Sequence, residues 1–73
     1  MKVNVTIGEW ADTKSGEFNL NMKEGATVED VMLILKLLPS ETGLCAVNNN
    51  IVTRGHVLNE GDSLKFFPCI VGG

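Results

Sequence analysis

The chain is poor in the residue types from which most catalytic and metal sites are built. Its 73 residues include one histidine, His56, and two cysteines, Cys45 and Cys69. We find no glycine-rich phosphate loop, no Ser/His/Asp set and no Cys/His cluster in the sequence. We therefore expect no metal site and no autonomous enzyme. Two cysteines are also too few for the disulfide framework of a small secreted domain.

Long apolar runs and basic clusters are lacking too. The longest apolar run extends only from Val31 to Leu35, whereas a membrane-spanning helix needs about 20 residues. The first residues do not have the pattern of a signal peptide. With 6 basic and 9 acidic residues the net charge is −3, and no basic stripe suited to nucleic acid is present. We expect a cytoplasmic protein that binds neither membranes nor nucleic acid.

What is present is the composition of one small globular domain. Hydrophobic residues make up 44% of the chain and charged residues 21%. Apolar and polar residues alternate over residues 2–7 and again over 17–22, which predicts two strands. Because the turn signal Ser15-Gly16 lies between them, we expect the two strands to form a hairpin.

The segment after this hairpin carries the signals of a helix. Thr27 is suited to cap the first free N–H groups. We predict that the helix runs from Val28 to Leu38 and is ended by Pro39.

The apolar residues of this helix exceed one stripe. Those expected to face the sheet have i, i+3, i+4, i+7 spacing and are Val28, Val31, Met32, Leu35 and Leu38. Leu33, Ile34 and Leu37 fall outside that stripe. Two interpretations remain open for them: a wide buried face wrapped by loops, or a patch that binds a partner.

Three further strands are predicted in the second half, over residues 44–48, 51–52 and 63–67. An asparagine-rich turn and the turn Glu60-Gly61-Asp62 separate them. In the last strand the residues should alternate between two faces, with Leu64 and Phe66 on one face and Lys65 and Phe67 on the other. The order favours an α+β fold in which one main helix covers a mixed sheet of four to five strands.

The chain ends on Gly72-Gly73, and residues 66–73 carry no charged side chain. We expect a domain over residues 1–68 and a flexible tail over 69–73. Such a tail spans about 16 Å at about 3.3 Å per residue, which is enough to place a terminal carboxylate inside another protein. Two terminal glycines also arise by chance in roughly 1% of chains of this composition.

Short motifs along the chain resemble those of the β-grasp, or ubiquitin-like, fold. They lie at the helix start, around the asparagine turn, before the last strand and at the end: Thr27–Met32, Ala46–Asn48, Leu58–Asp62, Phe66–Pro68 and Gly72-Gly73. More narrowly, the whole chain is similar to the MoaD/ThiS family of sulfur carriers, which comprises the small subunit of molybdopterin synthase and the thiazole-synthesis carrier. No single motif is specific for this family, but the order of the motifs, the chain length and the terminal diglycine are specific when taken together.

The resemblance implies a carrier without catalytic residues of its own. The carboxylate of Gly73, next to Gly72, would be adenylated by an ATP-consuming activating enzyme and converted to a thiocarboxylate with sulfur from a sulfurtransferase. The thiocarboxylate would then donate sulfur to a substrate held by a large synthase subunit or a thiazole synthase. No permanently bound cofactor is implied. The Phe67-Pro68 pair slightly favours the molybdopterin type, with the thiazole type close behind.

Two other classes of function remain open for the same fold. One is an interaction module in which the diglycine is incidental, and the other is a ubiquitin-like modifier. In the second case Ile70-Val71 stands where ubiquitin has an arginine before its diglycine. We predict that Phe67, Pro68, Ile70 and Val71 form an apolar docking surface for the partner, although packing at the sheet edge explains Phe67 equally well.

The remaining candidates have ordinary structural explanations. Cys69 is close to the reactive end, but no neighbouring cation lowers its pKa, so we interpret it as a small apolar tail residue. Cys45 is predicted to lie in the core. His56 is predicted to be a solvated loop residue. Arg54 is predicted either to be solvated in the same loop or to dock an acidic surface of a partner. Trp10 is predicted either to pack on the hairpin or to contact a partner.

Overall fold

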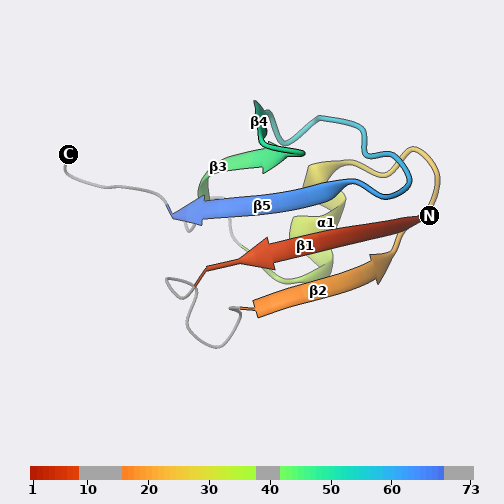
Figure 1. Cartoon of the computed structure of the whole chain (residues 1–73), viewed down its shortest axis with the longest axis horizontal. Helices are drawn as coiled ribbons and strands as arrows, with labels where there is room; N and C mark the ends of the chain where they lie inside the picture. The colour runs from red at the N-terminus through yellow and green to blue at the C-terminus, as the bar shows by residue number, and fades with distance from the viewer. Residues whose placement is uncertain (9–15, 38–41, 69–73) are drawn as a thin grey trace.

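A computed structural model describes residues 1–8, 16–37 and 42–68 of the chain (Figure 1). Its elements follow the predicted order, and they are β1 (Lys2–Ile7), β2 (Gly16–Asn21), α1 (Val28–Ile34), β3 (Thr42–Val47), β4 (Asn50–Val52) and β5 (Ser63–Pro68). The strands form one sheet in the order β2-β1-β5-β3-β4. β1 and β5 pair in parallel at the centre, and the other pairs are antiparallel. The predicted α+β fold with a mixed sheet is therefore confirmed.

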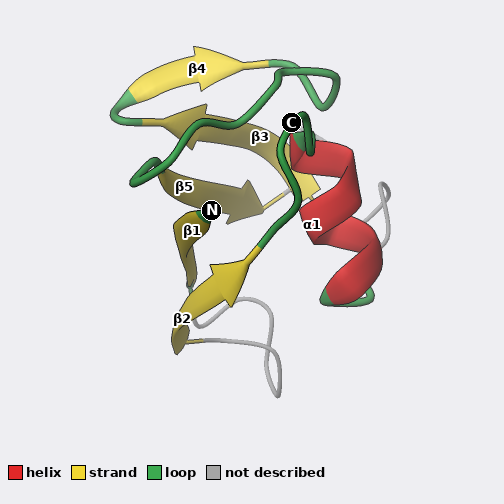
Figure 2. Ribbon diagram, turned by 90° about the vertical axis from the view of Figure 1, so that its right-hand side faces the viewer, coloured by secondary structure: helices red, strands yellow, loops and turns green. Residues whose placement is uncertain are grey.

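The helix packs on one face of the sheet and leaves the other face open (Figure 2). The strand alternation predicted from the sequence places every second side chain under α1. The largest fully buried side chains come from β1, α1, β5 and the loop before β5, and they are Val3, Val5, Val28, Val31, Leu58 and Leu64. The core is thus a single layer between α1 and the sheet.

The start of α1 follows the prediction and is reinforced by tertiary contacts. Thr27 is the N-cap, and it forms a capping box in which its backbone N–H donates to a carboxylate oxygen of Asp30 over 2.9 Å. The next free N–H groups, those of Val28 and Glu29, donate to backbone carbonyls from residues 54–56. This loop therefore satisfies donors that every helix N-terminus leaves unpaired.

The end of α1 differs from the prediction, because the helix stops at Ile34 and not at Leu38. Lys36 adopts a left-handed backbone with a φ of 58°. The N–H of Lys36 donates to the carbonyl of Leu33, and the N–H of Leu37 donates to the carbonyl of Met32. These two bonds define a Schellman motif, which ends a helix without any proline. This helix end could not be predicted from the sequence, because the left-handed position is occupied by Lys36 and not by the usual glycine.

The early stop changes which apolar residues are buried. Leu37, predicted to lie outside the buried stripe, is buried, whereas Leu35 is only partly buried. The side chains of Leu33 and Ile34 are exposed, at 70% and 55% of their surface. The interpretation of a wide buried face is therefore wrong for Leu33 and Ile34. Leu38 and the predicted stop signal Pro39 lie outside the described residues.

Strand boundaries in the second half shift by one or two residues. β3 begins at Thr42, because an irregularity between Thr42 and Leu44 lets pairing with β5 continue past Gly43 to Pro68. β3 and β4 are joined by Asn48 and Asn49, which both have positive φ. Positive φ at both positions is the requirement of a two-residue hairpin turn that matches strand twist. The predicted asparagine turn is confirmed.

Candidate functional site

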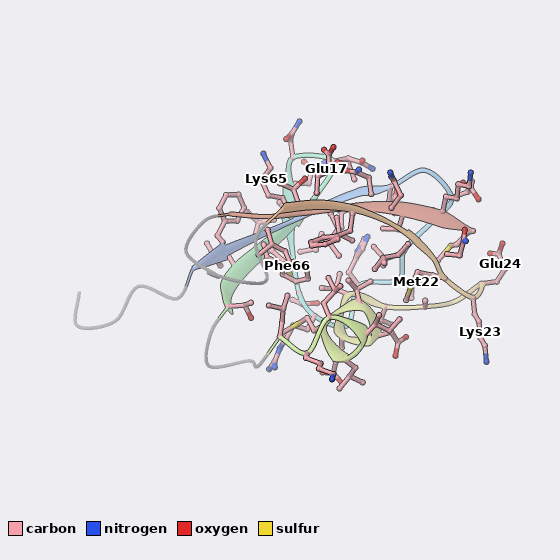
Figure 3. All side chains as sticks on the ribbon, turned by 90° about the horizontal axis from the view of Figure 1, so that it is seen from below. Glu17, Met22, Lys23, Glu24, Lys65 and Phe66 are labelled. Carbon is pink, nitrogen blue, oxygen red and sulfur yellow. The ribbon has the colours of Figure 1, made fainter. Side chains whose placement is uncertain are left out.

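The face of the sheet opposite α1, which we call the outer face, carries the candidate site. Directly opposed residues of an antiparallel pair lie on the same face. In β3 and β5, Cys45 opposes the buried Phe66, so Leu44 and Phe67 oppose each other on the outer face. Figure 3 shows the two faces of the sheet, with Phe66 directed toward the helix and Lys65 away from it. The predicted alternation of β5 is confirmed.

Three large apolar side chains are exposed at the β5-β3-β4 end of the outer face. Leu44 has 56% of its surface exposed, Ile51 has 61% and Phe67 has 37%. Leu44 and Phe67 form a cross-strand pair, and Ile51 opposes Ala46, which is the next residue of β3 on the same face. We call Leu44, Ile51 and Phe67 the tail-side patch. A cluster of this kind on a small domain is typical of a protein-binding surface.

The tail-side patch lies where the last strand ends. β5 ends at Pro68, whose register partner is Thr42 at the start of β3. The remaining sequence is Cys69-Ile70-Val71-Gly72-Gly73. The predictions made for these five residues lie outside the described part of the chain, as does that for Trp10. Of the predicted docking residues, the structure thus places Phe67 on an exposed surface and Pro68 at the end of the strand.

A groove of about 620 Å³ adjoins the tail-side patch. Its walls include Leu44, Ile51 and Arg54 at the rim, and the core residues Met32, Cys45 and Phe66 on the α1 side of the sheet. Arg54 is exposed, as predicted, and provides a positive charge at this rim. The groove therefore leads from the patch toward the α1 side of the sheet.

The rest of the outer face is polar. Lys65 is in register with Thr6 of β1, and Thr6 is in register with Glu17 of β2. Figure 3 shows Lys65 and Glu17 on the same side of the sheet, away from Phe66 and Met22. Among the residues that the structure describes, the apolar side chains of the outer face are therefore confined to the β5-β3-β4 end.

Cys45 does not have the environment of a reactive thiol. It is buried, as predicted, and its thiol donates to the backbone carbonyl oxygen of Val52 over 3.2 Å. Burial raises the pKa of the Cys45 thiol, and the nearby Arg54 opposes this shift only in part. Since the thiolate is the nucleophile, a raised pKa makes Cys45 a poor sulfur acceptor.

The structure gives the residues of the loop after β4 a structural role. The backbone carbonyls of Arg54 and His56 accept the hydrogen bonds from the first turn of α1. The side chain of His56 is partly buried, so the prediction of a fully solvated histidine is only approximate. No group of three or more His, Cys, Asp or Glu side chains suited to a metal ion occurs among residues 1–8, 16–37 and 42–68.

Within the same ranges, no helix has the length and apolar character needed to cross a membrane.

Sequence reasoning identified Phe67 but missed Leu44 and Ile51 as parts of the candidate site. The available signal was the alternation Leu44-Cys45-Ala46-Val47, which separates two faces once Cys45 is assigned to the core. This alternation does not show which strands are neighbours, so it could not predict that these side chains form one cluster.

The arrangement of five strands and one helix is that of a β-grasp, or ubiquitin-like, domain. The model of the ThiS family matches residues 1–73. The chain therefore belongs to the ThiS family of ubiquitin-like sulfur carriers. Membership of this family implies partner enzymes in general, and an exposed apolar patch agrees with this.

Solved structures confirm the fold. SAMP1 from Haloferax volcanii is 16% identical with a TM-score of 0.75, and the match covers 100% of both chains. A putative molybdopterin converting factor, subunit 1, from Pyrococcus furiosus is 23% identical with a TM-score of 0.76, covering 96% of this chain and 99% of that one. At these identities the likeness concerns the fold alone. No curated protein matches the sequence.

Proposed function

We propose that the chain is a cytoplasmic sulfur carrier that acts through the carboxylate of Gly73. A partner enzyme would transfer AMP from ATP to this carboxylate and release pyrophosphate. A persulfide sulfur on a sulfurtransferase would then attack the acyl carbon and expel AMP. Cleavage of the resulting disulfide by a thiol would leave a C-terminal thiocarboxylate.

In this proposal the carrier contributes a docking surface and an extended C-terminus, and the partner enzymes contribute the catalytic groups. Acceptance of the thiocarboxylate sulfur would take place on a large synthase subunit or a thiazole synthase. We favour the molybdopterin type slightly, on the Phe67-Pro68 pair, with the thiazole type second. We propose no bound cofactor and no catalytic residue beyond the terminus itself.

One observation carries this proposal, namely the exposed tail-side patch beside the end of β5. Leu44, Ile51 and Phe67 offer a partner an apolar surface next to the strand that the Cys69–Gly73 segment follows. Five extended residues span about 16 Å, so Gly73 can reach an active site that lies within that distance of the end of β5. Since residues 69–73 carry no charged side chain, their desolvation in a channel costs little beyond that of the carboxylate.

The direct test is intact mass spectrometry of the chain after incubation with an activating enzyme, ATP, a persulfide donor and a thiol reductant. We expect the mass change for replacement of one terminal oxygen by sulfur. A variant that lacks Gly73 should show no such change and should unfold at nearly the same temperature, since terminal residues contribute little to stability. An unmodified chain in the presence of a demonstrably active partner enzyme contradicts the proposal, and isopeptide linkage to lysines would indicate a modifier instead.

A further inference from the structure

The outer edge of the sheet at β2 has unused backbone hydrogen-bonding groups. Among the described residues, β2 pairs with β1 alone. Met1 and Met22 exchange two backbone hydrogen bonds, of 2.8 and 2.7 Å. Because hydrogen-bonded and non-hydrogen-bonded pairs alternate in an antiparallel ladder, Glu17, Asn19 and Asn21 direct their N–H and C=O groups away from β1.

This edge has few of the features that usually prevent strand addition. Glu17 is the one charged residue of Gly16–Asn21, none of the six is a lysine or a proline, and the register with β1 is continuous without a bulge. An exposed edge of this kind is a template for another strand. Strand addition would place the new strand beside Phe18 and Leu20, which are only partly buried.

An apolar groove lies beside the same edge. It has a volume of about 530 Å³ and lies between residues 21–26 and α1, where Leu33 and Ile34 form the helix side. Asn21 and Met22 belong to this groove and also continue the β2 edge. Residues of an added strand that oppose Phe18 and Leu20 point to the α1 side of the sheet. The exposed edge and the exposed helix residues can therefore be covered by one extended segment.

The charges around the groove indicate the kind of segment. The groove is lined by two acidic residues, Glu24 and Asp30, and by one basic residue, Lys23. The whole chain has a net charge of −3. Figure 3 shows Lys23 and Glu24 projecting at the end of the molecule where β2 leads toward α1. A second copy would bring the same acidic groups and the same net charge to the interface, whereas a basic segment would be attracted.

We infer that the β2 edge and the α1 groove form a second docking site, which binds an extended segment of another protein by strand addition. The segment has aliphatic side chains at alternate positions and lysine or arginine at its ends. β2 lies at the opposite edge of the sheet from β4, which carries part of the tail-side patch. A protein bound here leaves Leu44, Ile51 and Phe67 accessible, so two partners can bind at once. This inference does not depend on the proposed sulfur chemistry.

The test uses a peptide of alternating isoleucine and threonine with two lysines at each end, titrated into the isotope-labelled chain. We expect amide shifts and slowed hydrogen exchange at Glu17, Asn19 and Asn21. Replacing the terminal lysines by glutamates should weaken binding, and added salt should reduce the difference between the two peptides.

One pair of variants separates backbone pairing from other contacts. Asn19→Pro removes an outward N–H while the hydrogen bonds to β1 persist, and proline is tolerated at such edge positions. Asn19→Ala is the matched control, because it also loses the side-chain bond to Asn4 but keeps the N–H. We expect Asn19→Pro to bind the peptide roughly 3- to 10-fold more weakly than Asn19→Ala, as for one lost hydrogen bond.

Three results would overturn the inference. The first is equal affinity of the two Asn19 variants when both spectra show an intact fold. The second is absence of binding at millimolar peptide, or shifts confined to the tail-side patch. The third is concentration-dependent dimerisation of the free chain through β2, which would make a second copy the occupant.

Discussion

Replacing Leu44 by alanine tests whether the tail-side patch binds the activating enzyme. Leu44 has 56% of its surface exposed, so about half of its apolar surface remains to be buried by a partner. Full burial of a leucine is worth roughly 1.5–3 kcal/mol, and the half still available is therefore worth about 1 kcal/mol. That loss corresponds to roughly a 5-fold decrease in affinity.

The assay is the rate of pyrophosphate release at subsaturating carrier with the cognate activating enzyme. We expect Leu44→Ala to raise the apparent KM roughly 5-fold and to leave kcat almost unchanged, because the reacting carboxylate is unaltered. Stability should change little. The substitution weakens one cross-strand pair with Phe67, and such pairs contribute about 0.2–1 kcal/mol.

Leu33→Ala is the matched control for this experiment. Leu33 is also an exposed leucine, at 70%, but it lies on α1. It should leave the KM for adenylation at the wild-type value and should weaken binding of the lysine-flanked peptide instead. If both alanine variants raise the KM equally, or if neither does, the assignment of the tail-side patch is refuted.

Two further predictions concern the fold. Lys36→Gly should relieve the left-handed backbone at the end of α1 and raise stability by about 1 kcal/mol, which is about 4–8 °C in Tm for a domain of this size; thermal unfolding measures it, and Lys36→Ala should show no such gain. Burial raises the pKa of the Cys45 thiol above its ordinary value of 9.0. As the pH rises through 9.0, the unfolded chain therefore loses the thiol proton before the folded chain does. In a Cys69→Ser background, denaturant unfolding should show stability that is constant below pH 9 and declines above it, and an unchanged slope after Cys45→Ala would contradict the assignment.

The sequence was sufficient for the fold class and the order of the elements, because most elements carry local sequence signals. Strand alternation, the capping residue Thr27 and the asparagine turn all act within a few residues, and the structure confirms each. Consistency of this kind between local signals and the global fold is typical of natural sequences. The family resemblance was likewise available from the order of short motifs, and the ThiS family match confirms it.

The candidate site was only partly predictable, because its residues come together through strand order. Leu44 and Ile51 are exposed as a cluster since β3 lies between β5 and β4. That order places residues distant in sequence side by side, and periodicity carries no information about it. Phe67 was identified only because it belongs to the strand that precedes the tail.

The end of α1 shows how one backbone angle changes the surface of a small domain. On a continued helix Leu37 would lie about 40° from Leu33 around the axis, since four residues turn by about 400°. Both leucines would then share an exposed face. The left-handed Lys36 turns the chain inward, and Leu37 packs into the core with Met32. Leu33 would be exposed in either case, at 70% of its surface, so the end of the helix changes the burial of Leu37 and not that of Leu33.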